Sequence, residues 1–193
     1  RRGKYWWFAR TIEGEQHPVF CRVPARDTQA SWTPPQIQPG TALEGEEVYF
    51  DTNAEAAAHS FYSIGGMSTD DAGTLLAYAE DTTGDEHYVD NVHGGAILDA
   101  AGERAFYMVA DSSWRPYRLY EHRVGTSADQ DRLLLQIDDE QLWSFPYLSA
   151  DKRDLLIYSG NSEYNETRIL DLADPEAEVV LLVGKEHRLE HNI

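Results

Sequence analysis

Short apolar runs alternate with polar turns along most of the chain, and the clearest case is residues 71–92. An apolar run at 75–80 is followed by a turn at 81–85, rich in Asp, Thr and Gly, and by a second run from Tyr88. Such turn residues supply local hydrogen bonds and permissive backbone angles, so the pattern predicts two strands joined by a hairpin. Weaker copies at 102–124 and 153–172 also place an Asp- or Asn-led turn between two strands. Three such units predict a repeat architecture.

The same pattern predicts strands through nearly the whole chain and very little helix. The best helical window in the first half of the chain is 53–59, and a proline-rich loop covers 24–41. The predicted strands are 5–11, 18–23, 48–51, 62–67, 75–80, 96–98, 104–109, 117–123, 133–137, 142–148, 155–159, 167–172 and 179–183.

The spacing of the strands predicts the fold class. Leu98 and Leu148 hold equivalent places 50 residues apart, and a four-stranded meander repeating every ~40 to 50 residues is typical of a β-propeller blade. We therefore expect an all-β, partial and open β-propeller of about three to four four-stranded antiparallel blades. The expected blades are 5–51 (incomplete), 62–92 (lacking its outer strand), 94–137 and 142–183. A β-sandwich is the alternative, because regular short strands look alike in both folds.

One interval is too short for this scheme. Asp81 and Asp111 lead equivalent turns but lie only 30 residues apart. Compared with a full blade, the deficit is roughly 10 to 20 residues. We predict that a segment of this size is missing between Val92 and Gly95.

Composition excludes several classes of function. The formal charge of -18 over 193 residues disfavours binding to nucleic acid or to an anionic membrane. The single cysteine, Cys21, cannot form an internal disulfide, and no Cys/His cluster has zinc spacing. The longest aliphatic run, 179–183, is too short to cross a bilayer, and residues 1–8 do not resemble a secretory signal. We expect a cytoplasmic location.

The sequence predicts no catalytic residue, cofactor or metal. Ser68, Ser127 and Ser162 each follow a Gly-x pair but lack the final glycine of the Gly-x-Ser-x-Gly nucleophile elbow. None of the seven histidines lies in a metal-ligand motif.

Two polar clusters have structural interpretations. Asp81, Asp85 and Glu86 lack the spacing of an EF-hand calcium loop, so we interpret them as a turn stabilised by carboxylates. The run containing Trp114, Arg115 and Arg118 interleaves aromatic and cationic side chains, which favours stacking between blades over contact with a ligand.

Several of these segments together resemble a known family. They are RRGKYWW at 1–7, LLAYAEDTTGDEHYV at 75–89, WRPYR at 114–118 before Gly125-Thr126, and NETRILDLADP at 165–175. They are similar to the N-terminal propeller of the oligopeptidase B group of the prolyl oligopeptidase family of serine peptidases, and the likeness covers essentially the whole chain.

The resemblance implies a seven-bladed propeller that covers an α/β-hydrolase domain with a Ser-Asp-His triad and admits only short peptides, cleaved after Arg or Lys. This chain departs from that plan. We expect it to lack the helical segment that the family places before Arg1, about half the blades, and the hydrolase domain. We therefore interpret it as a non-catalytic propeller portion. Its expected partners are the hydrolase domain of the same polypeptide, short basic peptides, and further copies that cover the open blade faces. A stand-alone β-rich binding module and a fragment of a five-bladed glycosidase are the alternatives.

Overall fold

Antiparallel strands form nearly all of the regular structure in a computed structural model that describes residues 1–26, 32–84 and 92–185. They form four separate sheets, each built from strands consecutive in the chain. The first sheet contains β1 (Tyr5–Arg10), β2 (Val19–Pro24) and β3 (Glu47–Asp51), and the second contains β4 (Ser63–Thr69) and β5 (Leu76–Asp81). The third contains β6 (Val92–Leu98), β7 (Arg104–Ala110), β8 (Pro116–Arg123) and β9 (Arg132–Gln136), and the fourth β10 (Trp143–Leu148), β11 (Asp154–Gly160), β12 (Asn165–Asp171) and β13 (Val180–Val183).

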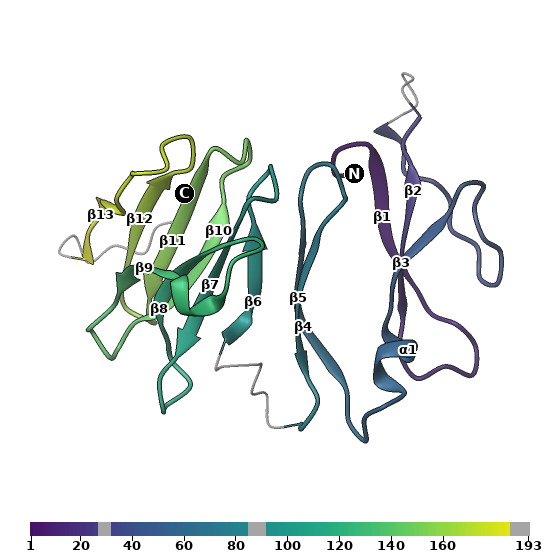
Figure 1. Cartoon of the computed structure of the whole chain (residues 1–193), viewed down its shortest axis with the longest axis horizontal. Helices are drawn as coiled ribbons and strands as arrows, with labels where there is room; N and C mark the ends of the chain where they lie inside the picture. The colour runs from purple at the N-terminus through teal and green to yellow at the C-terminus, as the bar shows by residue number, and fades with distance from the viewer. Residues whose placement is uncertain (27–31, 85–91, 186–193) are drawn as a thin grey trace.

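The sheets follow one another in chain order across the molecule, from β1–β3 on one side to β10–β13 on the other (Figure 1). Every pairing is antiparallel between sequence neighbours, as in the predicted meanders. The arrangement confirms the predicted all-β, open propeller and does not close into a barrel. Among the described residues, the helical elements with full bounds are α1 (Thr52–Ala56) and a 3-10 turn at Ala128–Gln130.

The main core lies between the last two sheets. Phe106, Met108 and Leu119 from β7 and β8 pack with residues of the facing sheet, and all of them are fully or almost fully buried. Alternate residues of a strand point to opposite faces, so one apolar face of each sheet is enough to build this layer. Burial of each such side chain contributes roughly 1.5 to 3 kcal/mol. The facing residues are Leu155, Ile157 and Leu170.

Equivalent turns follow β5, β7 and β11, and each begins with a side chain that accepts backbone hydrogen bonds. Asp81 Oδ1 accepts from the amide of Gly84 at 2.8 Å, and Asp111 Oδ1 from that of Ser113 at 2.8 Å. Asn161 Oδ1 accepts from Glu163 at 2.8 Å. The Asp- and Asn-led turns read from the sequence are therefore confirmed, and they show that β5, β7 and β11 hold the same place in successive sheets.

Strand β6 corrects one expectation. It runs without a break from Val92, opposite Val109, through His93, opposite Met108, to Leu98, with a bulge where Gly94 and Gly95 lie. A continuous strand here counts against a missing segment between Val92 and Gly95, because glycines accommodate the irregularity as a β-bulge. The strand expected from Tyr88 lies outside the described residues as far as residue 91.

Candidate functional site: a groove between the inner strands

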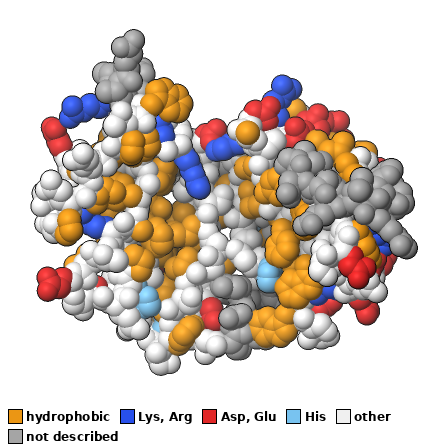
Figure 2. Space-filling view, turned by 180° about the vertical axis from the view of Figure 1, so that it is seen from behind, with side chains coloured by type: hydrophobic (Ala, Val, Ile, Leu, Met, Phe, Trp, Pro, Cys, Tyr) orange, Lys and Arg blue, Asp and Glu red, His pale blue; other side chains and the backbone are white. Residues whose placement is uncertain are grey.

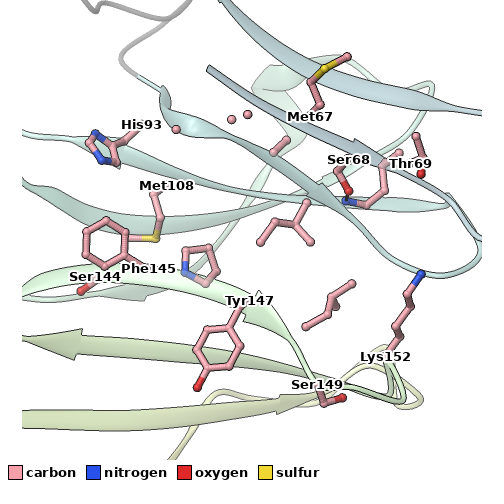
Figure 3. A pocket seen from close by; sticks show the side chains of 18 of the residues that line it. Met67, Ser68, Thr69, His93, Met108, Ser144, Phe145, Tyr147, Ser149 and Lys152 are labelled. Atoms are coloured by element: carbon pink, nitrogen blue, oxygen red, sulfur yellow. Dashed lines mark hydrogen bonds between the residues drawn. The ribbon is translucent and has the colours of Figure 1, made fainter. Parts of the chain in front are cut away.

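The first strands of the last three sheets, β4, β6 and β10, border a groove of about 480 Å³. Met67 comes from β4, His93 from β6, and Phe145 and Tyr147 from β10, while Met108 of β7 lies at the floor (Figure 3). The residues that line it thus include aromatic and thioether residues as well as serines and glycines. Adaptable apolar walls of this kind suit peptide side chains better than they suit one rigid ligand.

Glycines allow the two inner strands β4 and β6 to come into contact. A Cβ atom placed on Gly66 would lie 2.0 Å from the carbonyl oxygen of Gly94, and one on Gly95 would lie 2.8 Å from Cα of Gly66. Gly94 and Gly95 also have positive φ angles of 74° and 107°, which L side chains rarely adopt. Both strands carry a register shift at their Gly-Gly pair, so the same device recurs in successive sheets.

Serine hydroxyls in the groove take part in structural hydrogen bonds. Ser68 Oγ accepts from the amide of Leu98 at 3.0 Å and so joins β4 to β6. Ser144 Oγ lies 2.8 Å from Ser159 Oγ, and both residues are fully buried. These contacts connect strands and do not resemble the hydrogen bond from a nucleophile to its base.

The charged residues that line the groove are Arg2 and Lys152. Lys152 forms an ion pair with Asp71, which joins the β10–β11 hairpin to the β4–β5 hairpin across one intervening sheet. In a chain with a formal charge of -18, the groove lining itself therefore carries positive charge. In the view of Figure 2, acidic side chains lie mostly toward the outline of the molecule, whereas hydrophobic side chains are frequent in the middle of the view.

The predicted turn residue Asp81 is buried, and its carboxylate caps the turn that follows β5. Its Oδ1 accepts from the amide and the hydroxyl of Thr83 at 2.9 and 3.0 Å, in addition to Gly84. Asp85 and Glu86 lie outside the described residues. Among the residues that are described, no group of three or more His, Cys, Asp or Glu side chains could hold a metal ion.

The predicted aromatic and cationic run lies at the β7–β8 turn. Arg115 is only 6% exposed; its Nε donates to Asp111 Oδ2 at 3.0 Å, and its Nη1 donates to the carbonyls of Ile137 and Asp139 at 3.0 and 3.1 Å. It therefore ties the turn to the connection from β9 to β10. Arg118 Nε donates to Gln136 of the neighbouring strand at 2.7 Å. Trp114 has a φ of 64° at the third turn position, where the turn after β5 has Gly84.

Sequence reasoning missed a buried ionic cluster in the first sheet. Arg10 binds Glu46 through two parallel bonds, Nε to Oε1 at 2.8 Å and Nη2 to Oε2 at 2.7 Å. The guanidinium holds the pKa of Glu46 down at about 2, further helped by the amide of Leu43. Burial raises the pKa of the adjacent Cys21 thiol to about 11, with Glu46 adding to the effect. Arg10 and Glu46 are separated by 36 residues, so no local motif indicated the pair.

Ser127 precedes the 3-10 turn at Ala128–Gln130 and makes no capping bond through its side chain. His122 Nδ1 lies 2.7 Å from Asp131 Oδ1, so its partner is a carboxylate. Within the described ranges, no helix is both long and apolar enough to span a membrane.

Comparisons with known proteins agree with the propeller architecture. The chain is 27% identical to dipeptidyl aminopeptidase BI of Pseudoxanthomonas mexicana and 24% identical to protease 2 of Moraxella lacunata, with 94% and 91% of the chain aligned to 27% and 26% of those proteins. The structure of oligopeptidase B from Trypanosoma brucei with covalently bound antipain, in a closed form, superposes with a TM-score of 0.79 at 27% identity, covering 93% of this chain and 26% of that one. The chain thus spans about a quarter of the length of these proteins.

The alignment with the Pseudoxanthomonas protein also measures a shortfall. It runs over 201 positions but takes in only 94% of 193 residues, so about 20 positions of that relative have no counterpart here. This agrees in size with the deficit expected from the blade spacing.

The family model described as the prolyl oligopeptidase N-terminal beta-propeller domain matches residues 1–96 and 98–192. The four antiparallel sheets of consecutive strands agree with a β-propeller domain, and the match covers almost the whole chain. The chain therefore belongs to the family of prolyl oligopeptidase N-terminal β-propeller domains.

Proposed function

We propose that the chain is the non-catalytic propeller portion of an oligopeptidase B-like serine peptidase that cleaves short peptides after Arg or Lys. In this proposal the catalytic triad belongs to an α/β-hydrolase domain of the same polypeptide, and the groove between β4, β6 and β10 restricts which peptides reach it. The observation that carries the proposal is the groove itself, which is bordered by the inner strands and lined by Phe145, Tyr147 and Met67. The family match and the likeness to oligopeptidase B from Trypanosoma brucei support it.

The test compares peptides of increasing length in the full-length peptidase. Phe145 is 43% exposed in the groove, so Phe145→Ala widens it at small cost to the fold. We expect kcat/KM for long Arg-containing peptides to rise, while kcat/KM for a dipeptide-sized Arg substrate stays unchanged. Val180→Ala, on the outer strand β13, is the matched control. An equal response of long and short substrates to Phe145→Ala would refute restriction by the groove.

We further propose that the net charge of -18 steers basic peptides toward the enzyme. Because Arg2 and Lys152 line the groove, the attraction comes from the surrounding surface, where salt screens it over about 8 Å at 0.15 M. Second-order rates for Arg substrates should then fall as salt rises, and rates that do not depend on salt would exclude steering.

We expect the isolated chain to associate with itself, because the outer strand β13 exposes Val180, Leu181 and Leu182 by about half. Light scattering at increasing concentration tests this, and a monomer at every concentration would contradict it.

We also expect a cytoplasmic location, given the single, unpaired Cys21. Cell fractionation would test that expectation.

A further inference from the structure

A cavity of about 540 Å³ opens at one end of the third and fourth sheets, and we call it the hairpin-end cavity. It lies where the β6–β7 and β10–β11 hairpins come together, beside the end of β8 and the chain that follows β12 (Figure 1). All of its lining residues are described. Val92 and Lys185, which border undescribed ranges, lie at the far ends of β6 and β13 from this cavity.

The hairpin-end cavity gathers positive charge in a strongly acidic chain. Four cationic residues line it against two acidic ones, although the whole chain has 16 basic and 34 acidic residues. At 0.15 M salt, exposed charges more than about 8 Å apart are largely screened, so the local cations decide which ligand is attracted. The cationic residues are Arg104, Arg123, Lys152 and Arg153, and the acidic ones are Asp99 and Glu103.

Two of the arginines face each other across neighbouring strands. Arg104 of β7 pairs directly with Arg123 of β8, so both side chains extend from the same face of the sheet. The amide of Val124 donates to the carbonyl oxygen of Glu103 at 3.0 Å, which makes Arg104 and Arg123 a non-hydrogen-bonded pair. Side chains lie closer in such pairs, and like charges directly opposite each other are destabilising. An anion bound beside both guanidinium groups would offset this repulsion.

Two of the cations already have protein partners. Arg104 donates from Nε to Asp99 Oδ2 at 3.0 Å and from Nη2 to the carbonyl oxygen of Leu172 at 2.6 Å. Lys152 forms its ion pair with Asp71 of the β4–β5 hairpin. These contacts fix the walls of the cavity and leave the other two cations for a ligand.

The remaining cations are Arg123 and Arg153. In the described part of the chain, neither side chain takes part in a hydrogen bond or an ion pair, and the charged neighbour of Arg153 is the exposed Asp151 on its own hairpin. The carbonyl oxygen of Arg153 accepts from the amide of Leu172 at 2.8 Å, and Arg104 binds the carbonyl of the same residue. The fold therefore brings Arg153 beside the opposed arginine pair.

The rest of the lining is small and apolar. Such a wall has no groups that compete for an anion, and it can cover the organic part of a ligand whose charged end contacts the arginines. These residues are Ala100, Ala101, Leu172, Ala173 and Pro175.

We propose that the hairpin-end cavity binds a phosphate group, carried by a small ester or present as the free ion. A guanidinium group can donate two parallel hydrogen bonds to phosphate oxygens, and we assign this contact to Arg123 and Arg153. Arg104, held in place by Asp99, adds positive charge beside them. This binding does not depend on the peptidase activity proposed above.

The test titrates the full-length protein with phenyl phosphate and with inorganic phosphate, by calorimetry at 0.15 M NaCl in a buffer without phosphate. We expect saturable one-to-one binding and a Tm that rises with ligand concentration, because the ligand binds the folded state. Tighter binding of phenyl phosphate would assign the site to an ester, and equal binding would assign it to the free ion. Either result supports the proposal, whereas the absence of saturable binding by both probes would overturn it.

Three variants locate the site. Arg123→Gln and Arg153→Gln, both at exposed positions, should each weaken binding about tenfold, which corresponds to about 1.4 kcal/mol. Arg118→Gln is the matched control, because it removes the same charge from the same strand five positions from Arg123 and on its other face. Unchanged affinity in both cavity variants, or equal weakening by Arg118→Gln, would overturn the proposal. So would an Arg123→Gln protein that keeps the full rise in Tm with phenyl phosphate.

Discussion

Replacing Gly66 by alanine tests whether contact between the inner strands holds β4 against β6. Gly66 has no positive φ, so alanine fits its backbone and the effect is purely steric. Its Cβ would lie 2.0 Å from the carbonyl oxygen of Gly94, whereas an ordinary C···O contact is roughly 3.3 Å. The two backbones must therefore separate by about 1.3 Å. Overpacking costs about 1 to 3 kcal/mol, and we expect the upper end because the obstacle is backbone.

Thermal unfolding measures this cost. For a domain of this size, each kcal/mol lowers Tm by about 2 to 4 °C, so Gly66→Ala should lower it by about 6 to 12 °C. Gly125→Ala is the control, since its φ is 90° but no atom lies within 4 Å of the new Cβ. Backbone strain alone should cost that variant about 1 kcal/mol. A Gly66→Ala protein no less stable than Gly125→Ala would refute the steric argument.

Three further predictions concern buried polar groups. Glu46→Gln should lower the free energy of unfolding by about 2 kcal/mol at pH 7. Because the pKa of Glu46 in the folded chain is depressed to about 2, the stabilisation by this carboxylate is present above about pH 4.5 and is lost as the pH falls toward 2, so denaturant titrations should show a shallower decline in acid for the variant. Glu47→Gln, at a carboxylate that is 54% exposed, is the control and should change the stability little. Cys21, fully buried and with a pKa raised to about 11, should react with a thiol reagent at pH 8 only as fast as the protein unfolds, and rapid labelling of the native chain would contradict this. Asp111→Ala should destabilise by about 3 kcal/mol in urea unfolding because it leaves the buried Arg115 without its carboxylate and removes the acceptor of the turn amides. Asp111→Asn keeps the acceptor for the amides and should lose less. An Asn variant as stable as the original chain would show that the ion pair contributes nothing, and equal losses in both variants would show that the amide bonds contribute nothing.

The strands and their turns were predictable because they depend on local interactions. A period of two in apolar residues defines a strand within five or six positions, and β7, β8 and β11 lie within one or two residues of their predicted bounds. Asp81, Asp111 and Asn161 bond to amides only two to four residues ahead, so each turn is encoded in a short window.

The spacing of 30 residues between Asp81 and Asp111 predicted a segment missing between Val92 and Gly95, and the continuous strand β6 counts against that position. Gly94 and Gly95 indicate a turn when the chain is read by itself. In the fold they form a bulge within β6, since β4 crosses at Gly66 and leaves no room for side chains. Only the approach of a strand about 30 residues away distinguishes a bulge from a loop.

The sequence by itself determined the strands, the order of the repeats and the capped turns, since each is stabilised by groups a few residues apart. The tertiary structure alone decided the groove and the pairing of Arg10 with Glu46. Those features join residues separated by tens of positions. Their geometry depends on how whole sheets pack and which edges they leave open, and no local pattern of polar and apolar residues carries that information.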